Sequence, residues 1–457
     1  MKYLLKNGTL VSGEGTEQKD ILIEGEKIVK IAPHIEDGDA EEINVEGKLL
    51  FPGFIDGHTH FDLEVAGTVT ADDFETGTKA AISGGTTLVI DFASQDKGGH
   101  TLKEGLEKWN KKADGKCSCD YSFHMSIVEW NEETEKEIQD MIEEGITSFK
   151  LYMTYPAMMV EDRDLYKILK KLNECGCFAG VHCENAGVID ALIEEAKKEG
   201  RLGPENHPLV RPDTMEAEAV HRLLVIAKEA GAPVMVVHLT NKKAYEEIVK
   251  ARENGQTVFA ETCPQYLLLD DSAYSKPDFG GAVYVCAPPL RKKEDQDCLW
   301  KALANGQIQT VATDQCSFTL EQKAMGKEDF TKIPGGLPGV QTRGTLLYTY
   351  GVREGKITVE QMCRLLSENP AKLYGVYPKK GALLEGSDGD IVVFDPEKES
   401  VISAKTHAYN TDNNPFEGFA LHGDIDKVFL RGNLVVEGGK VVEEKTGEYV
   451  KRGKRQM

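Results

Sequence analysis

The chain has 457 residues, with 54 Lys and Arg against 76 Asp and Glu, and a formal net charge of −22 at pH 7. This charge excludes nucleic acid and anionic membrane surfaces as partners, because their phosphates would be repelled instead of neutralised. The length allows one large barrel domain and a smaller module, with a sizeable buried core.

The first residues, MKYLLKNGTLVSGEG, contain a short apolar run that Lys6 and Asn7 interrupt. This run is too brief for the apolar region of a signal peptide, and no later run approaches the ~18 apolar residues of a membrane span. Ten cysteines occur without a C-x-x-C pair, so we interpret them as reduced thiols and not as zinc-finger ligands. We therefore expect a cytoplasmic protein without a membrane partner.

The two chain ends share a pattern of short strands. Residues 1–51 alternate apolar and polar positions between glycine turns, as in YLLKNGTLV and ILIEGEKIVKIA. The same alternation recurs near the C-terminal end in DIVVFDP and KVFLRGNLVVEGGKVVEE, and it is typical of short strands. Neither end has enough strands to bury a face alone. We predict one composite β-sandwich from residues 1–51 and 377–457; two separate small domains are the alternative.

Residues 52–376 alternate strand and helix patterns. TTLVIDF precedes TLKEGLEKWNKK, FAGVHCE precedes VIDALIEEAKKEG, and APVMVVHL precedes NKKAYEEIVKARENG. Repeated βα units imply a parallel sheet with helices outside, and eight of them close into a barrel. The predicted fold class is α/β, a TIM-like (β/α)8 barrel that carries the small β-module.

Polar side chains follow several predicted barrel strands where each strand ends. Any one histidine there is more often structural than a ligand, and a lone lysine is more often at the surface. Together they suggest a metal site, because the carboxyl ends of barrel strands carry the chemistry and neutral imidazole is a common metal ligand. The two histidines of the HTH segment also point to one face. The candidate ligands are His58, His60, Lys150, His182, His238 and Asp314.

Two segments are too long for ordinary barrel connections, Phe61–Asp73 after the first strand and Phe318–Gly339 after the last candidate ligand. Long irregular loops in compact domains are usually functional. We expect both to wall a substrate pocket. A disordered surface insertion is the alternative, chiefly for the charged portion Glu321–Asp329.

Longer motifs extend this pattern over nearly the whole chain: FPGFIDGHTHF, GTKAAISGGTTLVIDF, SFKLYMTY, ETCPQYLLLD, CAPPLR, IPGGLPGV and LEGSDGDIVVFDP. In these motifs the chain resembles the cyclic amidohydrolases, with the dihydropyrimidinases and bacterial hydantoinases most similar. The resemblance implies the same barrel, a homotetramer, and hydrolysis of a small cyclic amide.

The resemblance also implies a site with two divalent metal ions, for which zinc is the expected metal. His58, His60 and Asp314 would hold the first ion and His182 and His238 the second. Lys150 would link them after reaction with carbon dioxide, as N6-carboxylysine, because an ammonium cannot bind a cation. Paired ions can lower the pKa of a shared water towards neutrality.

Two side chains carry the catalytic roles that the resemblance implies. Asp314 would shuttle the proton from the attacking water to the departing amide nitrogen, which is a poor leaving group unless it is protonated. Tyr155 would stabilise the oxyanion; a buried core tyrosine is its alternative.

Further positions match the family's substrate-binding segments. Main-chain groups of Ala287 and Gly335 would clamp the ring amide, although the commonest pattern has serine and asparagine there. Gln315 also departs from the pattern, which has histidine. The expected lining of the pocket for the exocyclic substituent, with simple loop packing as the alternative, is Leu63, Val65, Tyr152 and Met159.

The substrate class follows from a missing cation. Relatives that bind anionic rings carry an arginine beside the HxH strand, whereas no cation follows His60 until Lys79. We therefore expect neutral rings, dihydropyrimidines or 5-substituted hydantoins, opened to N-carbamoyl amino acids. The alternatives are an allantoinase-like hydrolase of another cyclic ureide and a non-catalytic scaffold of the same fold.

Overall fold

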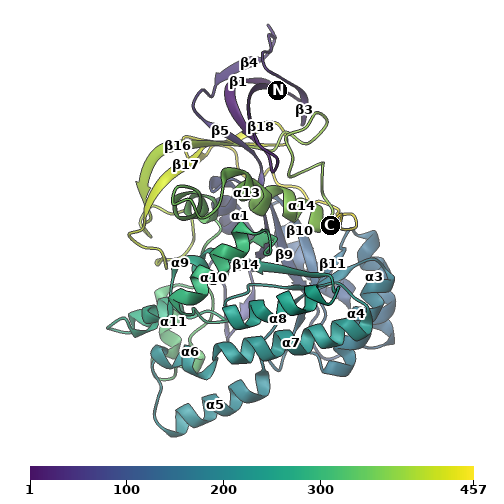
Figure 1. Cartoon of the computed structure of the whole chain (residues 1–457), viewed down its shortest axis with the longest axis vertical. Coiled ribbons are helices and arrows are strands. Elements are labelled where there is room, and N and C mark those ends of the chain that lie inside the picture. The colour runs from purple at the N-terminus through teal and green to yellow at the C-terminus, as the bar shows by residue number, and fades with distance from the viewer.

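The computed structural model describes residues 1–457 and shows a barrel with a sheet at one end of it (Figure 1). Eight parallel strands form the barrel in the order β15-β14-β13-β12-β11-β10-β9-β6. Their bounds are β6 (Phe54–Thr59), β9 (Thr86–Ser94), β10 (Asp120–Ser126), β11 (Ser148–Tyr152), β12 (Phe178–His182), β13 (Val234–Val236), β14 (Val258–Thr262) and β15 (Thr310–Val311). The predicted TIM-like barrel is confirmed.

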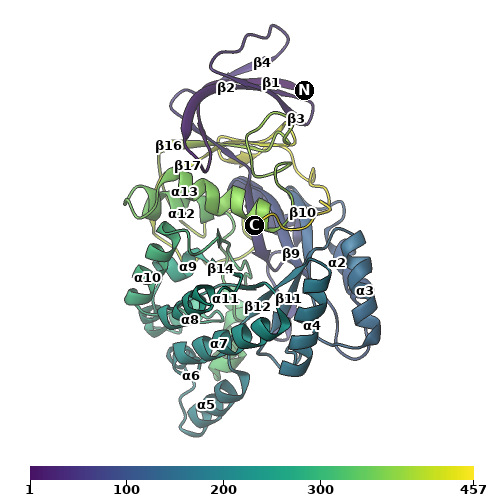
Figure 2. The ribbon, with the colours of Figure 1, turned by 45° about the vertical axis from the view of Figure 1, so that its right-hand side comes forward.

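Helices cover the outside of this barrel (Figure 2). The longer ones are α1 (Phe74–Ser83), α2 (Leu102–Ala113), α3 (Glu132–Glu143), α4 (Asp162–Glu174), α5 (Ala186–Lys198), α7 (Asp213–Ala230), α8 (Lys242–Glu253) and α10 (Lys293–Ala304). The short ones are α6 (His207–Val210), α9 (Pro264–Leu268), α11 (Leu320–Lys323), α12 (Arg343–Leu347), α13 (Val359–Cys363) and α14 (Asn369–Leu373). None of them is both long and apolar enough to span a bilayer.

The amphipathic pattern explains how these helices pack. In α4 the buried side chains are Leu165, Ile168, Leu169 and Leu172, a spacing of three and four residues that makes one apolar stripe. This stripe faces the barrel, and the charged residues of the helix face solvent.

The first and last strands are joined where the barrel closes. Thr59 and Gln315 form a parallel bridge, and the buried carboxylate of Asp56 accepts hydrogen bonds from the Thr313 hydroxyl at 2.7 Å and the Thr313 amide at 3.3 Å. Below them the Arg343 guanidinium donates to the carbonyls of Ile55 and Val311. Closure places the segment around His58 beside the segment around Asp314.

The chain ends form a second sheet of nine strands in the order β19-β18-β17-β16-β5-β1-β2-β3, with β4 paired to β1. Their bounds are β1 (Lys2–Val11), β2 (Thr16–Glu24), β3 (Lys27–Ala32), β4 (Glu41–Asn44), β5 (Leu49–Pro52), β16 (Ile391–Val401), β17 (Ala420–Leu430), β18 (Asn433–Glu437) and β19 (Lys440–Val441). Since β5 pairs with β16, the prediction of one module shared by both chain ends is confirmed. The alternative of two separate small domains is wrong. The boundaries 1–51, 52–376 and 377–457 remain our proposal.

The last residues leave this sheet and pack beneath the barrel. The Val450 amide donates to the Tyr121 carbonyl at 2.8 Å, and the buried Arg452 guanidinium donates to the hydroxyl of Ser148 at 2.7 Å. That hydroxyl also bonds to the His124 ring. These contacts were not apparent in the sequence, and they make His124 a structural histidine.

Candidate metal centre

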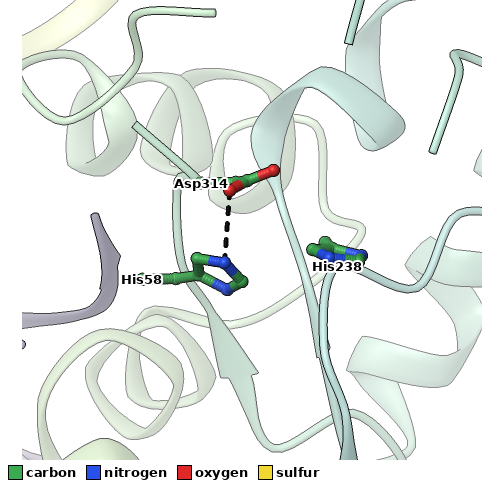
Figure 3. Close-up of side chains that lie close together, drawn as sticks. All are labelled: His58, His238 and Asp314. Atoms are coloured by element: carbon green, nitrogen blue, oxygen red, sulfur yellow. Dashed lines mark ion pairs between the residues drawn. The ribbon is translucent and has the colours of Figure 1, made fainter. Parts of the chain in front are cut away.

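The predicted ligands meet at the carboxyl end of the barrel. One ligand atom from each of His58, His238 and Asp314 lies within 4.8 Å of the others (Figure 3). One oxygen of Asp314 lies 3.2 Å from His58 Nε2 and 3.1 Å from His60 Nε2. The His182 ring centroid is 4.6 Å from that of His238. Four histidines and one carboxylate therefore form a single buried cluster.

Lys150 lies in the same cluster. Its side chain is 1% exposed, and its Nζ is 5.0 Å from the ring centroid of Phe92. The same ring lies 4.6 Å from His58 and 4.8 Å from His60, centroid to centroid. Burial lowers the pKa of Lys150 to about 8. An amine with this pKa spends a larger fraction of time unprotonated near neutral pH than an exposed lysine does.

Three of the four histidines and Asp314 have charge states that suit a bound cation. Burial lowers the pKa of His60 to about 4 and also lowers those of His182 and His238, so these rings are neutral near pH 7 and offer a lone pair. Burial acts to raise the pKa of Asp314, but His58 and His60 outweigh it and hold that pKa well below its usual range. Asp314 is therefore a carboxylate.

One buried nitrogen of the cluster is unpaired. His238 Nδ1 makes no hydrogen bond, although buried polar atoms are nearly always paired. Nitrogen and carboxylate donors of this kind are the usual ligands of zinc and related divalent ions. The residues present fit a metal ion.

Comparisons with known proteins give the same assignment. Residues 49–435 match the Amidohydrolase family, and a D-hydantoinase of Geobacillus stearothermophilus is 45% identical over 458 residues, which cover 99% of this chain and 97% of the relative. The chain belongs to the amidohydrolase family. A D-hydantoinase of Streptomyces coelicolor is 43% identical over 442 residues, 95% of this chain and 94% of the relative. The crystal structure of a dihydropyrimidinase from Brevibacillus agri NCHU1002 has a TM-score of 0.99 and 45% identity, and covers 100% of both chains.

Membership of the amidohydrolase family implies use of a divalent metal, and the structure adds two carboxylates that support the predicted ligands. His58 Nδ1 donates to Glu261 at 2.6 Å, and His182 Nε2 donates to Glu184 at 2.7 Å. Such partners orient a ligating imidazole and raise its basicity. The sequence analysis missed both. Glu261 lies near the carboxyl end of the strand VFAET, as the predicted ligands lie near the ends of theirs, and this signal could have found it.

Glu261→Gln is expected to weaken metal affinity about 10- to 100-fold, because a neutral amide polarises the His58 ring less than a carboxylate does. Competition with a chromophoric chelator measures the affinity. Glu253→Gln, at an exposed position on α8, is the control and should leave it unchanged. Equal affinity in the two variants would contradict the supporting role of Glu261.

Tyr155 lies beside the metal cluster in a strained conformation. Its φ is 67°, and His238 and Asp314 also have positive φ, at 39° and 54°. Such angles are uncommon for residues with side chains and gather at functional sites. The Tyr155 ring centroid is 5.2 Å from that of His182, and burial raises the pKa of the phenol. Near neutral pH the phenol is therefore a hydrogen-bond donor.

A cation that the sequence analysis missed stands next to Tyr155. The Arg211 guanidinium lies 5.6 Å from the centre of the Tyr155 ring, but it donates to Glu184 at 2.6 Å. Burial acts to raise the pKa of Glu184, but Arg211 and His182 lower it to about 2. This cation is already paired with a carboxylate, so it does not provide the free partner that an anionic ring would need.

The predicted amide-clamp segments lie side by side near Asp314. The Gly336 amide donates to the Val285 carbonyl at 2.9 Å, and Leu337 bridges Gln315, the residue after Asp314. Ala287 is half-buried and Gly335 exposed, so main-chain groups of both segments can be reached by a ligand. The segment 318–339 contains α11 and further short helical turns, so a disordered insertion at Glu321–Asp329 is wrong.

The residues predicted to line the pocket fall into two groups. Tyr152 is buried 6.1 Å from the His182 ring, centroid to centroid, and Met159 is half-buried, its amide donating to the Tyr155 carbonyl. Leu63 is half-buried, whereas Val65 is 37% exposed on the hairpin of β7 (Glu64–Val65) and β8 (Thr68–Val69). Tyr152 is next to the metal cluster and Met159 next to Tyr155; the role of all four in binding stays a prediction.

Gln315, the departure that the sequence left uninterpreted, has a structural role. Its fully buried amide donates to Asp72 at 3.2 Å and accepts from the amides of Gly339 at 2.7 Å and Val340 at 3.1 Å. An amide provides both a donor and an acceptor. It therefore joins the end of one long segment, 61–73, to the end of the other, 318–339.

Proposed function

We propose that this amidohydrolase opens neutral cyclic amides, dihydropyrimidines or 5-substituted hydantoins, to N-carbamoyl amino acids. The observation that carries the proposal is the buried cluster of four histidines, Asp314 and Lys150 at the barrel mouth. The full-length relatives named D-hydantoinase support the substrate class. No observation favours allantoin or a non-catalytic scaffold.

We propose that the metal is zinc, bound as two ions. His58, His60 and Asp314 would hold one ion and His182 and His238 the other. Carbamylated Lys150 would link the two. The lowered pKa of Lys150 supports carbamylation, because only the neutral amine attacks carbon dioxide. When bound, the ions would supply a water of lowered pKa. The buried His238 Nδ1, which makes no hydrogen bond, supports this arrangement.

Side chains and main-chain groups of the protein would transfer the proton, stabilise the oxyanion and hold the substrate. The Asp314 carboxylate accepts the proton of the attacking water and passes it to the ring nitrogen as the amide bond breaks. The Tyr155 phenol donates a hydrogen bond to the carbonyl oxygen as negative charge develops there. Main-chain groups of Ala287 and Gly335 hold the ring amide, and Leu63, Val65, Tyr152 and Met159 contact the exocyclic substituent.

The test is turnover of dihydrouracil, hydantoin and 5-phenylhydantoin by zinc-loaded protein, with allantoin as the comparison ring. We expect ring opening of the first three, loss of at least about 90% of the rate after chelation, and recovery when zinc is returned. Inactivity of fully metallated protein against all three rings would refute the proposal. Chiral analysis of the product tests a preference for the D-enantiomer, which the names of the relatives support.

We further propose a cytoplasmic homotetramer. The ten cysteines are free thiols, which agrees with a reducing compartment. Light scattering of the purified protein measures the number of subunits.

A further inference from the structure

A lysine in the second long segment is buried without a carboxylate. Lys323, the last residue of α11, is 2% exposed. Its Nζ donates to three main-chain carbonyls, those of Val285 at 3.0 Å, Pro334 at 2.8 Å and Gly336 at 2.9 Å. A buried lysine is normally paired with an acid, so this arrangement calls for an explanation.

The three acceptors determine the protonation state of the amine. An ammonium has three N–H donors, whereas a neutral amine has two donors and a lone pair that would face a carbonyl oxygen. Burial lowers the pKa of Lys323 to about 8, so the ammonium still predominates at neutral pH. It pairs with all three carbonyls at once.

These carbonyls belong to the two segments that carry the proposed amide clamp. Val285 lies two residues before Ala287, and Pro334 and Gly336 flank Gly335. A Cβ built on Gly335 would lie 3.9 Å from the Cα of Cys286, so the two segments are in contact at this point. The ammonium of Lys323 therefore holds together the main chains on both sides of the proposed clamp.

The neighbouring side chain ties the same helix to the other long segment. The Gln322 side-chain amide donates to the Thr68 hydroxyl at 2.8 Å and the Val69 carbonyl at 2.6 Å on β8. The Thr319 hydroxyl caps α11 by accepting from the main-chain amide of Gln322. Consecutive residues of one short helix thus contact three segments around the proposed substrate pocket.

We propose that Lys323 is a positioning residue for the substrate: its ammonium sets the spacing between the main-chain groups of Ala287 and Gly335 that hold the ring amide. The inference rests on the proposed function. Lys323 contacts no predicted metal ligand, and its effect is on ring binding and not on the metals.

Lys323→Met tests the inference, because methionine keeps an unbranched apolar side chain only one atom shorter but removes all three donors. The KM for hydantoin and dihydrouracil should rise at least about tenfold while kcat changes less than about threefold, the pattern expected when uniform binding is lost. Metal content should stay at the wild-type value. Lys327→Met, exposed in the same segment, is the matched control and should match the wild type.

Hydrogen–deuterium exchange gives a readout that needs no substrate. Amides in 285–287 and 335–337 should exchange faster in Lys323→Met than in the wild type and in Lys327→Met, with the barrel strands unchanged. If the methionine variant does not fold, Lys323→Gln carries the test, because its amide keeps two donors and should raise KM by a smaller factor.

An unchanged KM, or a raised KM accompanied by loss of metal, would overturn the inference. If the wild type opens none of the rings, the proposed function fails. The role of Lys323 is then tested by hydrogen–deuterium exchange alone. Faster exchange in both segments would then still support Lys323 as the group that spaces them, and unchanged exchange would refute it.

Discussion

Asp314→Asn is expected to lower kcat for ring opening by about 10³-fold or more, with the fold retained. Its carboxylate lies 3.2 Å from His58 Nε2 and 3.1 Å from His60 Nε2, where an anion can bind a metal and also accept a proton. Asparagine has a similar shape but neither the charge nor the basicity. Steady-state kinetics measure the loss, and circular dichroism checks the fold.

Asp297→Asn is the control for this variant, because Asp297 is exposed on α10, and it should keep the wild-type rate. Metal analysis separates the two roles of Asp314. If Asp314→Asn keeps its metal but not its rate, the proton shuttle accounts for the loss. A wild-type rate in Asp314→Asn would contradict both roles.

Lys150→Ala should lower the rate of ring opening by at least about 10³-fold and should lose metal, because it removes the group proposed to link the two ions. Burial lowers the pKa of Lys150 to about 8, so roughly a tenth of the amines are neutral at pH 7, when carbon dioxide can react with them. Zinc analysis and kinetics measure the two losses.

Short carboxylic acids such as acetate or propionate should partly restore Lys150→Ala, because they bring an anionic carboxylate into the space that the side chain leaves. Amines of the same size serve as the control and should restore nothing. Rescue by amines and not by acids would show that the unmodified ammonium is the active form, against the carbamate. Full activity of the unsupplemented variant would remove Lys150 from the site.

The element order and the candidate metal ligands could be predicted because their signals are local in the chain. Each candidate ligand lies in or shortly after a predicted strand of the barrel, so parallel pairing brings them to one end. The pattern at Glu261 was equally local but was overlooked. The resemblance added the roles of Tyr155, Ala287 and Gly335, which no local pattern indicates.

The interpretation of the two long segments was harder from sequence. The charged portion Glu321–Asp329 left a disordered insertion open as the alternative to a pocket wall, yet Lys323 is buried and Gln315 joins both segments. The path of the last residues beneath the barrel was also missed, because the contacts of Arg452 lie about 300 residues away in the chain.

By itself the sequence determined the barrel, the composite sheet and the set of candidate metal ligands, since periodicity and strand-end positions are properties of short stretches of chain. Only the tertiary structure decided which partners support that set. His58 meets Glu261 across 203 residues, and Lys323 reaches back 38 residues to Val285. The physical reason is that buried polar groups must find partners wherever the closed fold brings an acceptor or donor within reach.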